Sequence, residues 1–216
     1  MENHNDEILD DFHFLKDERG VQLFGGLDYF LKDGMHIQDY DPTIAEFHYL
    51  KKWYYQINEY YKKYYGIGLV VKGEEREAFY YLDYNSTSRG NIPEGSRSFM
   101  KNEYIIIGLL LYKIKIIDRD VELESIDKFK DILKLEFEQY QQGLLKLIAK
   151  SNSETRVAED DETIDRTIDS SFRQFRRLGW VHFDKDYFEL RPAFKRLVIL
   201  YEDVINNIEE HIKGFQ

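Results

Sequence analysis

Apolar residues recur every three or four positions along most of this chain, which is the spacing of one face of an α-helix. The pattern predicts a short helix that Gly34 ends and a long amphipathic helix that begins after Pro42. The apolar stripe of the short helix comprises Val21, Phe24, Leu27, Phe30 and Leu31. Two β-rich runs, Gly68–Lys72 and Ala78–Tyr84, then flank a charged turn, as the strands of a hairpin do.

The second half of the chain repeats this order of helices and hairpin. Three helices are expected, at about 99–117, 122–137 and 162–178, and Gly179 is placed to end the last. The runs "WVHF" and "YFEL" predict a second hairpin. After Pro192, an apolar stripe that reaches Ile212 predicts one closing amphipathic helix.

Helices followed by a hairpin are typical of a winged-helix domain. We therefore expect a mainly α fold with small β-hairpins, an α+β fold in which two winged-helix domains stand in tandem before a C-terminal amphipathic helix. The predicted divisions are an acidic N-terminal tail at 1–20, a first domain at 21–86, a linker at 87–97, a second domain at 98–191 with a polar insertion at 139–161, and the closing helix at 192–216.

Composition excludes several classes of protein. The 216 residues include no cysteine, so disulfides and thiolate metal sites are absent. The longest apolar run, Tyr104–Tyr112, has about half the length that a membrane-spanning helix needs. The first nineteen residues carry seven acids and two bases and have no apolar segment typical of a signal peptide. We expect a cytoplasmic protein that does not bind membranes.

Charge is unevenly distributed along the chain. The net charge of −11 means that any nucleic-acid contact must be local. Residues 154–169 hold seven acids and two bases, whereas residues 170–196 hold seven bases and three acids. The third helix of the second domain places arginines opposite its apolar face, where helix-turn-helix proteins present the side chains that contact DNA. The candidate DNA contacts are Arg166, Arg173, Arg176, Arg177 and Lys185.

Two structural alternatives stand beside the functional interpretation of these residues. Asp169 precedes Arg173 by four positions, so an ordinary surface ion pair can account for part of the charge. Tyrosine offers a large contact area at low entropy cost, which makes the tyrosines candidates for a protein interface, although packing within their own domain is equally open. The candidate interface residues are Tyr54, Tyr55, Tyr61, Tyr65 and Tyr201.

No motif for catalysis is present. The six histidines are scattered without metal-ligand spacing, and no glycine-rich phosphate loop occurs. We therefore expect neither enzymatic activity nor a cofactor or metal.

Several strings match one family in order. "LFGGLDYFLKDGMHI", "FYYL", "SSFRQFRRLGWVHF" and "YFELRPAF" resemble MukE, the winged-helix subunit of bacterial MukBEF-type condensins, including its MksE branch. The similarity covers about residues 21–196. A closing amphipathic helix in place of a long polar tail favours the MksE side. Of the candidate DNA contacts, Arg173, Arg176 and Arg177 lie inside a matching string.

The resemblance implies a non-catalytic homodimer with two winged-helix domains per subunit. Its partner would be the kleisin subunit, through which it joins an SMC-like ATPase and organises chromosomal or plasmid DNA on the nucleoid. The alternative is a stand-alone winged-helix transcription regulator, whose arginine-bearing helix would read a major groove.

Overall fold

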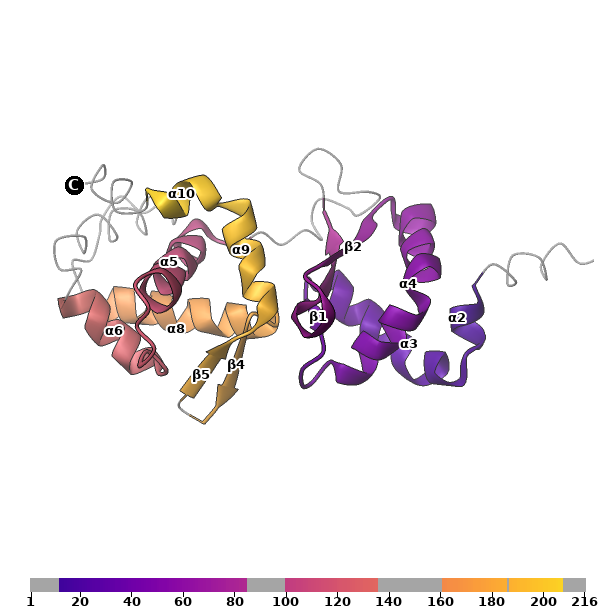
Figure 1. Ribbon diagram of the computed structural model, residues 1–216, viewed down its shortest axis with the longest axis horizontal. Helices are drawn as coiled ribbons and strands as arrows, with labels where there is room; N and C mark the ends of the chain where they lie inside the picture. Colours follow the sequence, from indigo (N-terminus) through magenta and orange to yellow (C-terminus); the bar gives the residue numbers. More distant parts are fainter. Residues whose placement is uncertain (1–11, 85–99, 136–160, 186, 208–216) are drawn as a thin grey trace, which may run out of the picture. The chain divides into compact units, whose positions relative to one another are not determined.

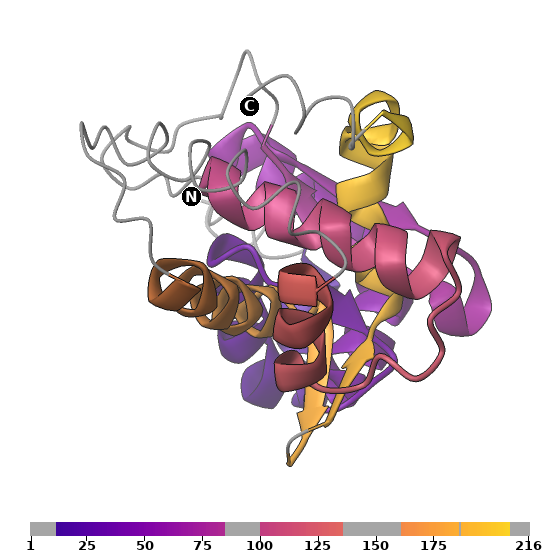
Figure 2. The ribbon, with the colours of Figure 1, turned by 90° about the vertical axis from the view of Figure 1, so that its left-hand side faces the viewer.

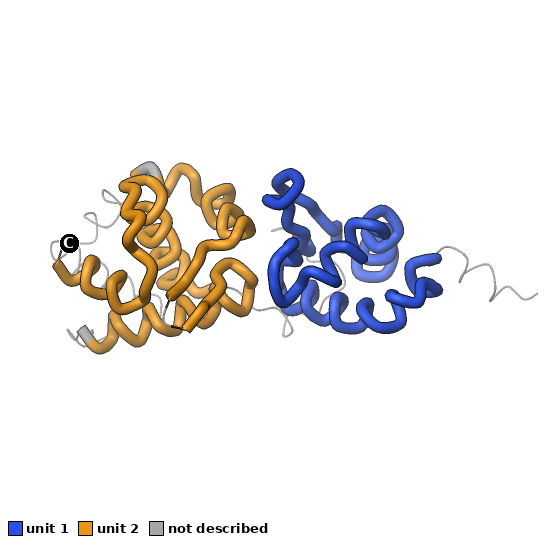
Figure 3. Tube along the Cα trace, turned by 60° about the horizontal axis from the view of Figure 1, so that its bottom comes forward, with its two compact units in different colours: residues 1–98 blue, residues 99–216 orange. Residues whose placement is uncertain are grey.

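The structure is a computed structural model that describes residues 12–84, 100–135, 161–185 and 187–207. The chain divides into two compact units, Met1–Ser98 and Phe99–Gln216 (Figure 3). The described residues are mainly helical with small antiparallel sheets, which confirms the predicted α+β class. The predicted linker at 87–97 lies outside the described residues, as does the predicted insertion at 139–161 apart from its last residue.

The first unit combines helices with a small three-stranded sheet (Figure 1). Its elements are α2 (His13–Lys16), α3 (Glu18–Lys32), β1 (Ile37–Gln38), α4 (Ile44–Tyr65), β2 (Gly68–Lys72) and β3 (Phe79–Asp83). All pairings are antiparallel in the order β1-β3-β2, with Leu69 opposite Leu82 and Ile37 opposite Tyr80. The predicted hairpin is therefore present. The sequence did not indicate β1, because two residues are too few to show an alternating pattern.

The predicted acidic tail at 1–20 is wrong for residues 12–20. Phe12 and Phe14 are buried in the core of the first unit, and Asp17 begins α3 by accepting a hydrogen bond from the Arg19 amide through its side chain. The Phe14 ring packs edge-on against Phe24. The tail was predicted from charge alone, whereas burial of two phenylalanine rings determines the local structure. Residues 1–11 lie outside the described residues.

Helices α3 and α4 supply seven of the fifteen buried residues of this core. Leu27 and Leu31 are fully buried as the stripe predicts, but Val21 is 80% exposed, so the stripe does not extend to the first turn of α3. The left-handed backbone of Gly34, with φ of 87°, follows the end of the helix as expected. Helix α4 matches its predicted span, although non-helical dihedral angles at Trp53 interrupt it with a kink.

The second unit contains more helices and a two-stranded sheet. Its elements are α5 (Asn102–Tyr112), a π turn (Lys113–Ile117), α6 (Ile126–Leu135), α8 (Asp161–Arg177), β4 (Val181–Asp184), β5 (Tyr187–Leu190), a 3-10 turn (Pro192–Phe194), α9 (Lys195–Leu200) and α10 (Glu202–Asn206). Strands β4 and β5 pair antiparallel, with Phe183 opposite Phe188. A single bridge joins Ser125 to Tyr187 of β5. The hairpin extends away from the helices of its unit (Figures 1 and 2).

Aromatic rings fill the core of the second unit. Phe172 of α8 packs against Phe129 of α6 and Phe188 of β5, at ring-centroid distances of 5.8 and 5.0 Å. One turn along α8, Phe175 contacts Trp180 and Phe194. These contacts hold α6, α8 and the hairpin together and fix which side of α8 faces solvent.

The predicted single helix from Pro192 to Ile212 is wrong within the described residues. Three short segments replace it, and Tyr201, with φ of −132° and ψ of 30°, separates α9 from α10. Leu197 before the break and Ile205 after it are both buried, while Ile199 and Leu200 stay exposed.

Candidate nucleic-acid and protein interfaces

Helix α8 separates its apolar and polar residues by face, as its sequence predicts. Ile164, Ile168, Phe172 and Phe175 recur at spacings of three and four residues and are all buried. The side chains of Thr167 and Ser171 donate hydrogen bonds to carbonyls one turn earlier in the helix, so these hydroxyls are satisfied without leaving it. The remaining surface of α8 carries its charged side chains.

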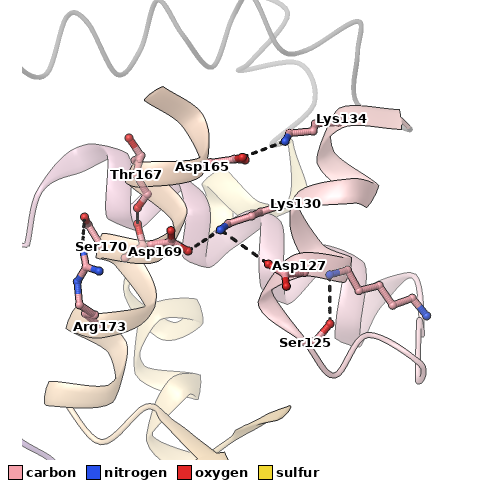
Figure 4. Close-up of polar contacts among 11 residues, drawn as sticks. Ser125, Asp127, Lys130, Lys134, Asp165, Thr167, Asp169, Ser170 and Arg173 are labelled. Atoms are coloured by element: carbon pink, nitrogen blue, oxygen red, sulfur yellow. Dashed lines mark hydrogen bonds and ion pairs between the residues drawn. The ribbon is translucent and has the colours of Figure 1, made fainter. Parts of the chain in front are cut away.

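Two acids of α8, Asp165 and Asp169, face α6. Lys130 Nζ lies 2.7 Å from Asp169 Oδ1, and Lys134 Nζ lies 3.0 Å from Asp165 Oδ2 (Figure 4). The predicted pairing of Asp169 with Arg173 is therefore wrong, because a lysine on the neighbouring helix satisfies Asp169 instead. Two lysines thus compensate two of the acids that made this part of the sequence look strongly negative.

Neutral side chains of α8 itself contact two of its arginines. Arg173 contacts the Ser170 hydroxyl at 2.8 Å, on the side of the helix away from α6 (Figure 4). Arg177 donates to the side-chain carbonyl oxygen of Gln174 at 3.2 Å. In both pairs a neutral side chain three residues earlier in the helix orients the guanidinium group.

Arg176 and Arg166 differ in their surroundings. The Arg176 guanidinium lies 5.9 Å from the centre of the Phe183 ring, which links the end of α8 to β4 through a cation–π contact. Arg166 forms an ion pair with Glu162 one turn earlier. The structure therefore groups Arg173, Arg176 and Arg177 at the C-terminal end of α8. Arg166 lies about 10 Å from Arg173 towards the N-terminal end of the helix, beside Glu162.

Lys185 occupies the turn of the hairpin between β4 and β5. Its backbone is left-handed, with φ of 57°, and its side chain is exposed next to the exposed Asp184. The turn therefore carries charges of both signs. Gln174 was not predicted to orient an arginine. Its position three residues before Arg177 is the feature of the sequence that could have indicated this role.

The five candidate tyrosines have different environments. Tyr61 is fully buried and donates a hydrogen bond to Asp28 Oδ1 at 3.0 Å. Burial, together with the neighbouring Asp28 carboxylate, raises the pKa of Tyr61 far above its usual value of about 10. Tyr61 therefore packs within its own unit, and its ring is not available to a partner.

Tyr54 and Tyr65 are half-buried and bonded within the first unit. The Tyr54 hydroxyl donates to the Leu69 carbonyl at 3.1 Å, and Lys32 Nζ donates to the Tyr65 hydroxyl at 2.7 Å. In contrast, Tyr55 is 82% exposed and touches the edge of the Tyr54 ring. In the second unit, Tyr201 is half-buried at the break between α9 and α10.

Among the described residues, no three histidine, aspartate or glutamate side chains are grouped so that they could hold a metal ion. Within the same part of the chain, no helix combines the length and apolar character that crossing a membrane requires.

Comparison with known proteins identifies the family of this chain. No curated protein matches the chain. The family model described as condensin complex protein MksE matches residues 22–202, a span that covers most of each unit and includes the arginines of α8 and both hairpins. Because this match covers most of the sequence, the chain belongs to the MksE family of condensin complex proteins.

Proposed function

We propose that this chain is a non-catalytic subunit of a bacterial SMC-like condensin, and that it acts in the cytoplasm on the nucleoid. The observation that carries the proposal is the match to the MksE family over residues 22–202. In this role the subunit binds the kleisin as a dimer, joins the SMC-like ATPase through the kleisin, and helps to organise chromosomal or plasmid DNA.

The order of elements supports two winged-helix domains in tandem. In the second unit, α5, α6 and α8 precede the β4–β5 hairpin, and Ser125 before α6 bridges to β5. In the first unit, β1 before α4 likewise pairs with the second strand of the following hairpin. A short strand that pairs with the second strand of a wing is the arrangement expected of this fold.

The arginine group of α8 supports a local contact with the DNA backbone. Arg173, Arg176 and Arg177 are exposed, and each contacts a neutral or aromatic side chain in the interactions described above. Since the whole chain carries a net charge of −11, it would bind DNA weakly alone and depend on the assembled complex for further positive surface.

The kleisin contact requires exposed surface with a large apolar component. Among the five candidate tyrosines, Tyr55 offers the most exposed ring, and the half-buried Tyr54 lies directly beside it. We assign this pair to the kleisin interface, with Tyr201 as a further candidate on the second unit.

Purification with and without the kleisin tests the proposal. A stable complex in gel filtration, with a mass that requires two copies of this chain, is expected, together with weak and salt-sensitive DNA binding by the isolated chain. The α8 arginines and the adjacent hairpin also suit the alternative of a transcription regulator. Tight, sequence-selective DNA binding by the isolated chain without any kleisin complex would establish that alternative.

A further inference from the structure

The side of α3 that points away from the core has an uncharged middle. The buried side of this helix holds Leu27 and Leu31. No residue from 20 to 27 is charged, although charged residues make up 33% of the chain. Six residues lie within about 60° of the direction of Gly25 around the helix. We call them the α3 face, and they are Glu18, Val21, Gln22, Gly25, Tyr29 and Lys32.

Two large apolar side chains of the α3 face are exposed. Val21 is 80% exposed and Tyr29 is 69% exposed. They lie four residues before and four residues after Gly25, about one helical turn to either side of it. A single exposed apolar residue is ordinary, whereas two on one uncharged stripe form a patch of the kind that a partner covers.

The glycines between these two side chains are not required by the fold of one chain. A Cβ atom at Gly25 or Gly26 would have nothing within 4 Å, and neither residue has a left-handed backbone. In the interior of an exposed helix, each glycine costs about 1 kcal/mol relative to alanine. Packing within the first unit gives no reason for this cost, whereas close approach of a second helix does.

The α3 face is complementary to itself. If two α3 helices cross antiparallel at Gly25, Val21 of one copy lies opposite Tyr29 of the other. Glu18 of one copy then lies opposite Lys32 of the other, so an acid meets a base at each end of the contact. A twofold contact uses the same surface on both subunits and therefore needs such complementarity.

Lys32 is able to take part in this pairing. Its Nζ atom donates to Asp28 Oδ2 and to the Tyr65 hydroxyl, each at 2.7 Å. An ammonium group has three donors, so a third is left for Glu18 of the second copy. Such an exposed pair contributes only about 0–1 kcal/mol, but it favours the antiparallel orientation over the parallel one.

We propose that the α3 face binds the α3 face of a second copy of this chain, antiparallel and with Gly25 at the twofold axis. The contact deepens the proposed function, on which it rests for the expectation that two copies associate. A helix of 15 residues is about 22 Å long. It covers less than the about 800 Å² per partner of a standard interface, so the dimer should dissociate in the micromolar range.

Disulfide trapping tests the register, because the chain has no cysteine of its own. Val21→Cys combined with Tyr29→Cys places each thiol opposite a thiol of the second copy. In either single variant the two identical positions lie about 12 Å apart in the dimer, too far for a disulfide. Mild oxidation should therefore link two chains of the double variant at least about tenfold faster than chains of either single variant.

Analytical ultracentrifugation of the isolated chain measures the association itself. Gly25→Glu places a charge on the twofold axis, opposite the same charge of the second copy, and should raise the dissociation constant at least about tenfold. A side chain at this position meets no neighbour in its own chain. The matched control, Ala45→Glu, adds the same charge at an exposed position of α4 and should leave the constant within about twofold.

Equal trapping rates in the single and double variants would overturn this contact. A chain that stays monomeric at millimolar concentration would do the same, as would equal dissociation constants for Gly25→Glu and Ala45→Glu. If two copies still assemble with the kleisin in any of these cases, the proposed function stands and the dimer uses another surface. One copy in the kleisin complex would instead contradict the proposed dimer. Circular dichroism checks that each variant is folded.

Discussion

Tyr55 and Tyr61 lie six residues apart on α4, yet one ring is exposed and the other is fully buried. Six residues place the two side chains roughly 120° apart around the helix, and the side of Tyr61 faces the core of the first unit. Asp28 on α3 accepts a hydrogen bond from the Tyr61 hydroxyl through one carboxylate oxygen and from Lys32 through the other. At this scale, a single carboxylate satisfies the hydroxyl of the buried tyrosine.

Tyr61→Phe should therefore destabilise the protein by about 2 kcal/mol. The substitution keeps the ring but removes a buried hydrogen bond to a charged group, and such bonds contribute about 1.5–3 kcal/mol. Urea unfolding followed by fluorescence measures the difference. Tyr55→Phe is the control and should change the free energy of unfolding by less than about 0.5 kcal/mol, since the Tyr55 side chain is exposed.

Alkaline pH should destabilise the first unit, because its folded state favours the neutral form of a buried tyrosine. Burial, with a smaller contribution from Asp17, raises the pKa of Tyr49 from 10.0 to about 12, and its hydroxyl donates to the Phe14 carbonyl at 2.6 Å. The neutral hydroxyl is thus favoured in the folded state. Its stabilising contribution is complete below pH 10 and is lost as the pH rises towards 12.

Absorbance at 295 nm and near-ultraviolet circular dichroism across this range measure tyrosine ionisation and unfolding together. Tyr49→Phe should remove part of the loss of stability at alkaline pH. If its alkaline transition matched that of the unmodified chain, Tyr49 would have no part in it.

Between elements, glycine decides how closely helices approach. Gly108 on α5 lies where α8 and α9 meet it, and a Cβ atom there would fall 2.5 Å from Leu197 Cδ2 and 3.1 Å from the Phe175 ring. Gly25 on α3 has nothing within 4 Å of the same position. The two glycines look alike in the sequence, but only Gly108 is required by packing.

The same substitution should therefore have opposite effects at these two sites. Gly108→Ala should destabilise the second unit by about 1–2 kcal/mol, because Leu197 and Phe175 must move. Gly25→Ala should stabilise the protein by about 0.5–1 kcal/mol, since alanine favours an exposed helix and meets no neighbour. Thermal unfolding of both variants compares them, and destabilisation by both would contradict this account.

For the whole molecule, the distribution of charge matters more than its sum. A chain of net charge −11 presents an arginine group at the end of α8 in one unit, and in the other unit it presents four exposed lysines of α4, namely Lys51, Lys52, Lys62 and Lys63. Exposed charges more than a Debye length of about 8 Å apart are largely screened at physiological salt. Each basic surface can therefore act locally despite the acidic total.

Arg173→Glu with Arg177→Glu should weaken DNA association of the assembled complex and leave subunit assembly intact. Both side chains are exposed and neither supports the core. If two phosphate contacts are lost, the slope of log affinity against log salt concentration should become shallower by about 2. Gel filtration of the complex is the control, and its loss would instead assign this face of α8 to protein binding.

The sequence by itself determined the local structure. Periodic apolar residues predicted α4, α8 and both hairpins to within a few residues, because burying one face of a helix or strand requires that spacing. It also separated the buried face of α8 from its arginines. Family membership followed from the strings around these elements, and the match to the MksE family confirms it.

Only the tertiary structure decided the roles of individual residues. It placed Phe12 and Phe14 in the core, gave the Tyr61 hydroxyl its partner Asp28, paired Asp169 with Lys130 and broke the closing segment at Tyr201. In each case the partner is distant in sequence or the backbone turns to reach the core. Local spacing carries no information on such contacts, since they depend on how the elements pack together.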